Sequence, residues 1–291
     1  CIRDRRTSRA GLELLEFMGQ GPFEPDHLDI IAAPNHDAAV IELIGGWIGN
    51  SRRRVVRLDG LMPRGRLARS LPRADSVTTH TCPTITVPRD MEAWIAARPG
   101  RMRSTISRGR KRLDRLGARF RRVDPNDVPA AMVRLGQLHH SRWGERSALS
   151  PRWADLSAAV GAGAHTGQVA IFELAVDDED DGSSLVIASE LHFDVAGRRF
   201  FYQSGRLDTK EWKASGTVLK YWVLADAVDR GIEVLDLLRG DEPYKAEWAD
   251  DHLDVVKFDC GFGAGRAALM LAGLRGRMLD QRHAQGRPTP Q

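Results

Sequence analysis

The stretch FYQSGRLDTKEWKASGTVLKYWVLADAVDRGIEVLDLLRGDEPYKAEW, residues 201–248, decides the fold that we expect for this chain. It begins on the end of a strand over residues 198–207. Apolar residues at helical spacing then predict a helix over residues 216–230, which Gly231 ends as a C′ glycine. Residues 232–240 are apolar on both faces, as is typical of a central parallel strand. The stretch therefore predicts a strand–helix–strand unit of a mixed α/β fold.

The segments around this stretch continue the same pattern. Strand-like segments at residues 168–176 and 185–195 precede the strand at 198–207, and the acidic and glycine-containing turns between them predict an antiparallel meander. A helical turn at residues 243–248 follows the parallel strand. The other expected elements are strands at residues 12–19, 28–33, 53–60, 84–87, 118–123 and 253–262, and helices at residues 36–48 (capped by Asn35 or Asp37), 90–100, 101–116, 125–143 and 263–279.

Length and composition exclude two classes of protein. The chain has 291 residues, of which 42% are hydrophobic and 28% charged, so it is not a disordered or collagen-like chain. No apolar run approaches the ~18–20 residues that cross a bilayer, so we expect no membrane insertion. Cys1, Cys82 and Cys260 are too widely spaced for a disulfide scaffold or a zinc motif, which favours a cytoplasmic location.

A basic segment lies near the middle of the chain. Residues 101–122 contain ten arginines and lysines against one acid, Asp114, with apolar residues at helical spacing. Such a helix can bind the phosphates of a nucleic acid or of coenzyme A, or can be a solvated connection between two halves of the chain. Phe120 is its single aromatic residue, which argues against a surface that stacks single-stranded bases.

The order of these elements resembles the core of the GNAT acyltransferases, and residues 201–248 resemble the cellulose-biosynthesis type, a Fem-like tandem GNAT. The matching pieces are the YQSG strand end, the helix start at Ala214-Ser215-Gly216 and the string LDLLRGDEPYKAEW. The resemblance implies a tandem GNAT-like (acyl-CoA N-acyltransferase) fold. The expected parts are a degenerate GNAT-like half at residues 1–100, a basic connecting helix and strand at 101–124, a GNAT-like acyltransferase half at 125–265, and a C-terminal helix and flexible tail at 266–291.

Two segments are candidates for holding an acyl donor. Ser215, Gly216 and Thr217 begin a helix after a strand, and exposed N–H groups at a helix start bind phosphate, although Ser215 can equally be an ordinary N-cap. If the preceding strand separates from its neighbour at Ser204 and Gly205, backbone groups there can polarise the thioester carbonyl, as the resemblance implies. The implied donor is acetyl-CoA or another acyl-CoA.

The candidate catalytic residues lie on one turn and one strand. Tyr244 stands where GNAT enzymes often place the tyrosine that protonates the leaving thiolate, and Asp241 or Glu242 can deprotonate the acceptor. Arg239 and Lys245 flank them and can bind phosphate or an anionic acceptor. The alternative is a salt-bridged turn.

Glu190 and His192 alternate on one strand and share a face, so either can be a general base or a structural residue. His139 and His140 lack a third ligand at metal spacing, so we expect no metal.

The sequence thus favours an acyl-CoA-dependent N- or O-acyltransferase acting on an amine or hydroxyl of a small molecule or saccharide, with a sugar or polysaccharide precursor as one acceptor. A Fem-type aminoacyl-tRNA-dependent transferase is the second interpretation, with tRNA held by the basic segment. A catalytically idle GNAT-like binding module is the third, because the helix start reads Ala214-Ser215-Gly216, without the proline of the family's usual Ser-Pro-Gly, and the glycine-rich pyrophosphate loop of ordinary GNAT enzymes is missing.

Overall fold

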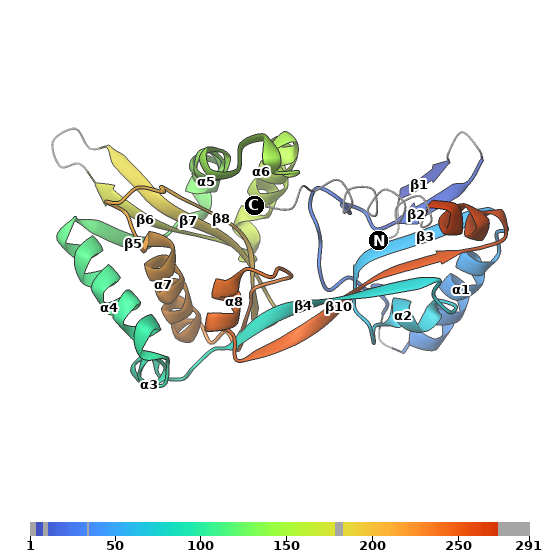
Figure 1. Ribbon diagram of the computed structural model, residues 1–291, viewed down its shortest axis with the longest axis horizontal. Coiled ribbons are helices and arrows are strands. Elements are labelled where there is room, and N and C mark those ends of the chain that lie inside the picture. Colours follow the sequence, from blue (N-terminus) through green and yellow to red (C-terminus); the bar gives the residue numbers. More distant parts are fainter. Residues whose placement is uncertain (1–3, 8–10, 34, 178–182, 273–291) are drawn as a thin grey trace, which may run out of the picture. The chain divides into compact units, whose positions relative to one another are not determined.

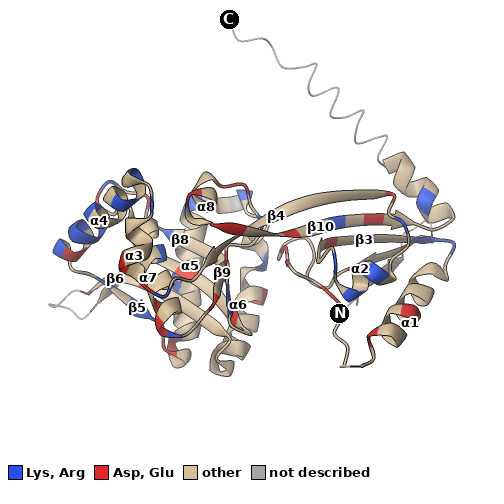
Figure 2. Ribbon diagram, turned by 90° about the horizontal axis from the view of Figure 1, so that it is seen from below, with Lys and Arg blue, Asp and Glu red and all other residues tan. Residues whose placement is uncertain are grey.

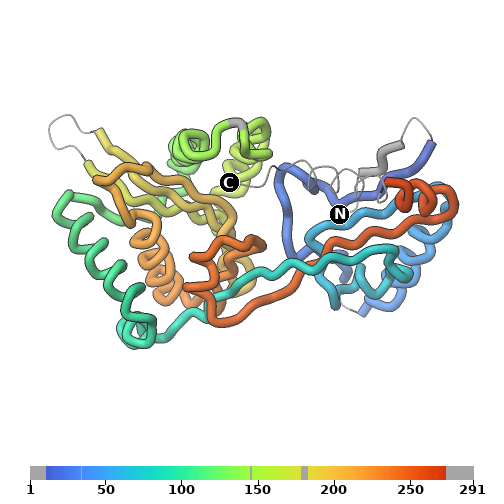
Figure 3. The backbone as a smooth tube through the Cα atoms, viewed as in Figure 1, coloured from blue at the N-terminus to red at the C-terminus, as the bar shows by residue number. Residues whose placement is uncertain are grey.

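The computed structural model describes residues 4–7, 11–33, 35–177 and 183–272, without the side chains of residues 4–7 and of Glu145. Its contacts divide the chain into two compact units (Figures 1 and 3). We call residues 1–81 with 254–291 the terminal unit and residues 82–253 the central unit. The boundaries predicted from the tandem architecture, at residues 100, 124 and 265, stay predictions, because a division by contacts does not test a division by structural duplication.

The elements follow in chain order. The strands are β1 (Asp4–Thr7), β2 (Glu13–Glu16), β3 (Arg54–Leu61), β4 (Ser76–Thr86), β5 (Ala118–Arg122), β6 (Val169–Asp177), β7 (Ser184–Val195), β8 (Arg198–Arg206), β9 (Val234–Asp236) and β10 (Asp251–Gly261). The α-helices are α1 (Asp37–Gly49), α2 (Arg66–Ser70), α3 (Met91–Ala96), α4 (Gly100–Arg115), α5 (Val128–Trp143), α6 (Trp153–Gly163), α7 (Ser215–Asp229) and α8 (Pro243–Trp248). A further helix begins at residue 264 and is described to residue 272.

The terminal unit is built on strands in the order β1-β2-β3-β10. β2 runs parallel to β3, while β1 and β10 are antiparallel to their neighbours. Its core combines residues from both ends of the chain, among them Leu15, Val56, Leu67 and Phe258. The antiparallel partner of β3 is β10, which comes from the far end of the sequence.

One predicted strand of this unit is wrong. Residues 28–33 form a single β-bridge at Leu28 and no strand. The reason is Asp29, whose carboxylate accepts hydrogen bonds from the backbone N–H groups of Arg66 (2.9 Å) and Leu67 (2.7 Å) at the start of α2. Because the Asp29 side chain caps α2, residues 28–33 do not form a regular strand.

The predicted cap of α1 is also wrong. Its N-cap is His36, without a side-chain hydrogen bond, and Asp37 pairs with Arg66 at 2.7 Å instead.

The central unit has the strand order β4-β9-β8-β7-β6-β5. β5 to β8 are antiparallel in sequence order, which confirms the predicted meander, and β8 pairs parallel with β9. In Figure 1, α7 and α4 lie on one face of the β5–β8 sheet and α5 and α6 on the other. The predicted mixed α/β fold is thus confirmed.

Some predicted segments fall on residues that the structure does not describe, and some observed elements were not predicted. Most of the acidic turn between β6 and β7 and the predicted tail lie outside the described residues. The sequence reading missed β1, α2 and α6. Among the described residues, no helix combines the length and apolarity that a bilayer crossing requires.

Candidate functional site

The parallel pair β8 and β9 separates early. β9 pairs only Val234, Leu235 and Asp236 with the first three residues of β8, and β8 continues to Arg206 without it. β9 ends because Leu238 adopts a left-handed φ of 54° and its N–H donates to Asp236 Oδ1 at 2.8 Å. The strand predicted over residues 232–240 is therefore three residues long, and residues 201–206 of β8 are not paired with β9.

Ser204 and Gly205 lie on the part of β8 that does not pair with β9, and on its other edge they pair with Glu190 and Ser189 of β7. The N–H of Ser204 donates to Gln203 Oε1 at 3.1 Å. Gly205 is required by α5, since a Cβ at this position would lie 2.6 Å from Leu138 Cβ and 2.9 Å from His139 N. The structure therefore places both residues beside the separation of β8 and β9, and gives Gly205 a packing role of its own.

The helix α7 begins next to the end of β8. Its N-cap is Ala214, in a left-handed conformation with φ 74°, and not Ser215. Ser215 is fully buried, its N–H donates to Trp212 O at 3.1 Å, and its hydroxyl has no partner among the described residues. Of the three predicted donor-binding residues, Ser215 thus has no exposed N–H group, which corrects the expectation that all three do. The side chain of Arg206 lies over Gly216.

A groove of about 460 Å³ opens at this helix start. Thr217 lines it, together with the cationic side chains of Arg206, Lys210 and Lys213 and the hydroxyl of Thr105 on α4. A helix N-terminus surrounded by three cations and by the hydroxyls of Thr105, Thr209 and Thr217 attracts phosphate groups. The remaining lining residues are Leu207, Asp208, Thr209, Trp212 and Ala214.

A buried polar cluster lies between β7 and α7. Glu190 and His192 share a face of β7, as predicted, and His192 Nε2 lies 3.0 Å from Glu190 Oε2. The Lys220 ammonium on α7 donates to Glu190 Oε1 at 3.0 Å and lies 3.9 Å from the ring centroid of Phe201. All three polar side chains are buried, and His192 is fully inaccessible. The contacts join them into one Lys220–Glu190–His192 cluster.

The charges of this cluster follow from its contacts. Burial raises the pKa of the Glu190 carboxyl, but the Lys220 ammonium and the hydrogen bond from His192 outweigh it, so the pKa is lowered overall. Burial lowers the pKa of His192, and its contact with Glu190 offsets this only in part. Glu190 is therefore a carboxylate and His192 is a neutral imidazole with its proton on Nε2. Neither is solvent-exposed, so we interpret both as positioning residues.

Tyr244 reaches this cluster from α8. Its ring centroid lies 5.6 Å from Lys220 Nζ. Burial, and next the negative charge of Glu190, raise the pKa of the phenol above its ordinary value. The hydroxyl therefore keeps its proton at neutral pH and is in the form that can donate it.

The turn before α8 holds the other predicted residues. Lys245 is buried, and its Nζ contacts Arg239 O at 2.7 Å, Leu238 O at 3.4 Å and Glu242 Oε2 at 3.1 Å. Gly240 has φ 143°, and a Cβ there would lie 2.1 Å from Glu242 Oε2. Lys245 thus holds its own turn closed. Asp241 is exposed on the same turn.

Lys220 is the residue that sequence reasoning missed. The signal was present in TVLKYWVLADAV, where it is the single cation in the buried face of an otherwise apolar helix. Its partner Glu190 is 30 positions earlier in the chain, so no local pattern joins them.

The sequence profile of the acetyltransferase (GNAT) domain matches residues 100–246, about half of the chain. The chain belongs to this family. The matched range covers the meander, the separation of β8 and β9, the groove at the start of α7 and Tyr244. The GNAT-like fold expected from the sequence is therefore confirmed, while the cellulose-biosynthesis type stays a prediction.

Solved structures share the fold of this GNAT chain at low sequence identity. One is the C-terminal domain (DUF2156) of a putative lysylphosphatidylglycerol synthetase from Agrobacterium fabrum, with a TM-score of 0.57, 12% identity, and coverage of 94% of this chain and 84% of that one. Another is FemX, with a TM-score of 0.56, 8% identity, and coverage of 87% and 81%.

A conserved protein of unknown function from Bacteroides thetaiotaomicron matches with a TM-score of 0.53, 9% identity, and coverage of 85% and 79%. A search of curated proteins gives no match. These likenesses show the fold alone.

Proposed function

We propose that this protein is an acyl-CoA-dependent N- or O-acyltransferase, with acetyl-CoA as the expected donor. The observation that carries the proposal is the early separation of β8 from β9, where only Arg198, Arg199 and Phe200 pair with β9. The opening lies between a phosphate-attracting groove at the start of α7 and the buried cluster under Tyr244. Transfer from an acyl-CoA needs three parts: an anchor for the coenzyme's diphosphate, a strand edge not paired with β9 for its pantetheine chain, and a proton donor for the leaving thiolate.

The donor's diphosphate fits the groove at α7. Thr217 lines the groove from the first turn of α7, where Gly216 precedes it, and Lys210 and Lys213 bring positive side chains. Arg206 lies above Gly216, where its guanidinium can pair with a phosphate in two hydrogen bonds. In this proposal Gly216 and Thr217 bind the donor, whereas the buried Ser215 packs beneath the start of α7.

The chemistry is direct transfer. The acceptor nitrogen or oxygen attacks the thioester carbonyl carbon, the new C–N or C–O bond forms and the C–S bond breaks. Tyr244 donates its phenolic proton to the leaving thiolate sulfur, and the acceptor's proton passes to a carboxylate of the 239–242 turn, for which exposed Asp241 is the candidate. Lys220 and Glu190 fix the position of Tyr244 from below.

The acceptor is an amine or hydroxyl of a small molecule or saccharide. A sugar or polysaccharide precursor is the choice that the resemblance to the cellulose-biosynthesis type supports.

The test separates donor binding from catalysis. Calorimetric titration of the full chain with acetyl-CoA is expected to give saturable binding, weakened about tenfold by Lys213→Gln, whereas Arg115→Gln on the exposed side of α4 leaves it unchanged. Thiol release in the presence of an amine and amino-sugar library then measures transfer.

Absence of binding at millimolar acetyl-CoA with folded protein refutes the proposal. Donor binding without transfer, or transfer that is indifferent to both Tyr244→Phe and Asp241→Asn, favours the idle binding module instead.

A second candidate is a Fem-type aminoacyl-tRNA-dependent transferase. The observation that favours it is the exposed basic side of α4, visible in Figure 2, which carries Arg101, Arg108, Lys111, Arg112 and Arg115. Neutralising Arg108 and Arg112 together is expected to weaken tRNA binding and to reduce its salt dependence by about two charges. If tRNA does not bind at low salt, this candidate is eliminated.

A further inference from the structure

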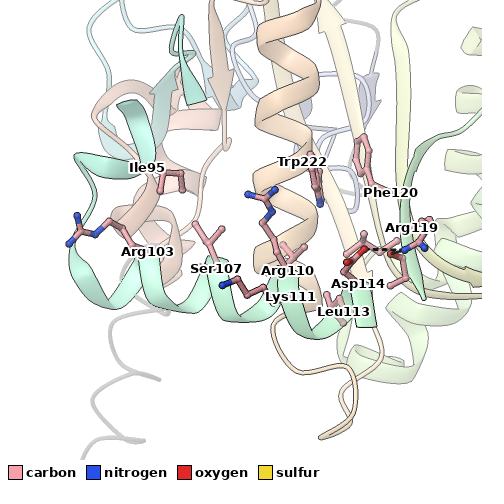
Figure 4. A pocket seen from close by; sticks show the side chains of 14 residues that line it. Ile95, Arg103, Ser107, Arg110, Lys111, Leu113, Asp114, Arg119, Phe120 and Trp222 are labelled. Atoms are coloured by element: carbon pink, nitrogen blue, oxygen red, sulfur yellow. Dashed lines mark hydrogen bonds and ion pairs between the residues drawn. The ribbon is translucent and has the colours of Figure 1, made fainter. Parts of the chain in front are cut away.

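A second and larger groove lies on the opposite side of α4, away from the groove at the start of α7. It has a volume of about 740 Å³ and is formed by α4, β5, β6 and α7. Figure 4 shows Arg110 extending from α4 into this groove toward Trp222, with Ser107 and Lys111 beside it. Aliphatic side chains make up most of its floor: Ile95, Ile106, Leu113, Ala118, Leu174 and Val218.

The groove carries positive charge that its surroundings do not neutralise. Its single acid, Asp114, pairs with Arg119 at 3.2 Å. Arg103 also lines the groove, and its guanidinium donates to the backbone oxygen of Ala96 at 3.1 Å. Within the described part of the chain, Arg110 and Lys111 have no carboxylate partner, so two cations at the groove are available to an anion.

Arg110 is held ready for such an anion. Its guanidinium carbon lies 4.7 Å from the ring centroid of Trp222 and 4.4 Å from that of Tyr221. Stacking on aromatic faces fixes the guanidinium plane while leaving its N–H edge free for two parallel hydrogen bonds to phosphate or carboxylate. The ammonium of Lys111, one residue along α4, is exposed and adds a flexible second charge.

The floor selects an aliphatic ligand over a nucleobase. The aromatic rings that line the groove are already engaged: Phe120 stacks on Trp222 at 5.9 Å and on Phe172 at 5.8 Å, and Arg110 covers Trp222. A base needs a free aromatic face, which this arrangement does not provide. A hydrocarbon chain needs only apolar surface; Ile95 is half-buried at the groove, and the other aliphatic lining residues are buried side chains at its bottom.

We propose that this groove binds an anionic amphiphile: a single aliphatic chain on the floor with a phosphate or carboxylate head on Arg110 and Lys111. The site is separate from the groove at the start of α7, so the proposal does not depend on acyl transfer.

The experiment is calorimetric titration of the full chain with n-decyl phosphate below its micelle concentration. We expect saturable binding that inorganic phosphate and decyltrimethylammonium do not reproduce. Arg110→Gln is expected to weaken binding at least tenfold. Arg108→Gln changes a neighbouring exposed arginine of α4 that does not line the groove, and it should leave binding within twofold. Ser107→Trp, at an exposed position on the groove wall, should block binding without disturbing the core. Decanoate then distinguishes a carboxylate head from a phosphate head.

Four outcomes overturn the proposal. They are no binding of either amphiphile, equal binding of the cationic amphiphile, equal losses in Arg110→Gln and Arg108→Gln, and displacement of decyl phosphate by acetyl-CoA or by a single-stranded oligonucleotide. The last would assign the groove to the acyl donor or to a nucleic acid.

Discussion

Replacing Lys220 by Met tests how the buried cluster is held together. The change keeps the length of the side chain and removes its charge, leaving the Glu190 carboxylate buried with only His192 as partner. At a separation of 3.0 Å and an effective dielectric of about 20, the lost attraction is about 5 kcal/mol. Removing one partner of a buried ion pair typically costs about 3–5 kcal/mol. We therefore expect Lys220→Met to lower the free energy of unfolding by roughly that amount.

The double variant separates charge from packing. In Lys220→Met with Glu190→Gln, no charge is left unpaired, and the amide oxygen of the new side chain can still accept the hydrogen bond from His192. We expect the double variant to recover at least half of the loss in Lys220→Met. The two substitutions should therefore be strongly non-additive.

The measurement is urea unfolding of the unchanged chain, the single variants Lys220→Met and Glu190→Gln, and the double variant at pH 7.5, followed by tryptophan fluorescence and by circular dichroism. A loss below about 1 kcal/mol in Lys220→Met, or additive losses in the double variant, refutes the reasoning. Such a result would mean that the Lys220–Glu190 pair is solvated and does not position Tyr244.

Three further predictions follow from the same geometry. Tyr244→Phe is expected to lower kcat by about 10²-fold or more with little change in the free energy of unfolding, measured by thiol release and urea unfolding; unchanged kcat would remove Tyr244 from the chemistry. Burial lowers the pKa of His192 in the folded chain, so as the pH falls below about 6.5 the unfolded chain takes up a proton before the folded chain does, and the free energy of unfolding declines. His192→Gln should flatten this decline between pH 7.5 and 5.5. An unchanged slope contradicts the conclusion that His192 is buried as a neutral imidazole. Gly205→Ala should cost about 1–3 kcal/mol because the new methyl group meets Leu138, whereas Gly161→Ala in α6, with open space around it, should be neutral or stabilising by up to about 1 kcal/mol; equal effects on Tm would show that α5 yields at this point.

The parts of the fold that local patterns specify could be predicted. The meander was predictable because three strand-like segments, which form strands of nine to twelve residues, follow one another with only acidic or glycine-containing turns between them. α7 was predictable from its apolar spacing and from Gly231, which has φ 67° after the helix end. In both cases the information lies within one segment.

The parts that depend on a distant partner could not be predicted. Residues 28–33 read as a strand because nothing near Asp29 shows that it caps α2. Leu238 adopts a left-handed φ in a run that reads as a continuous strand, because the following turn closes on Lys245.

The candidate site follows the same division. That Glu190 and His192 share a face could be predicted from the two-residue period of a strand. Their contact with Lys220 could not, because it joins two segments that are distant in the sequence. Tyr244 was named by resemblance, and the structure adds the raised pKa of its phenol.

The division of the chain also has a consequence for its synthesis. β3 finds its antiparallel partner only in β10, so the terminal unit lacks Val256, Phe258 and Cys260 from its core until the ribosome has passed residue 261. At about 5–20 residues per second, the first 81 residues wait about 10–40 s while the 180 residues from 82 to 261 are made. During that interval the apolar faces of β2 and β3 are open to chaperones, while residues 82–253 become complete first. A nascent chain halted near residue 250 should accordingly protect its middle from protease before its beginning.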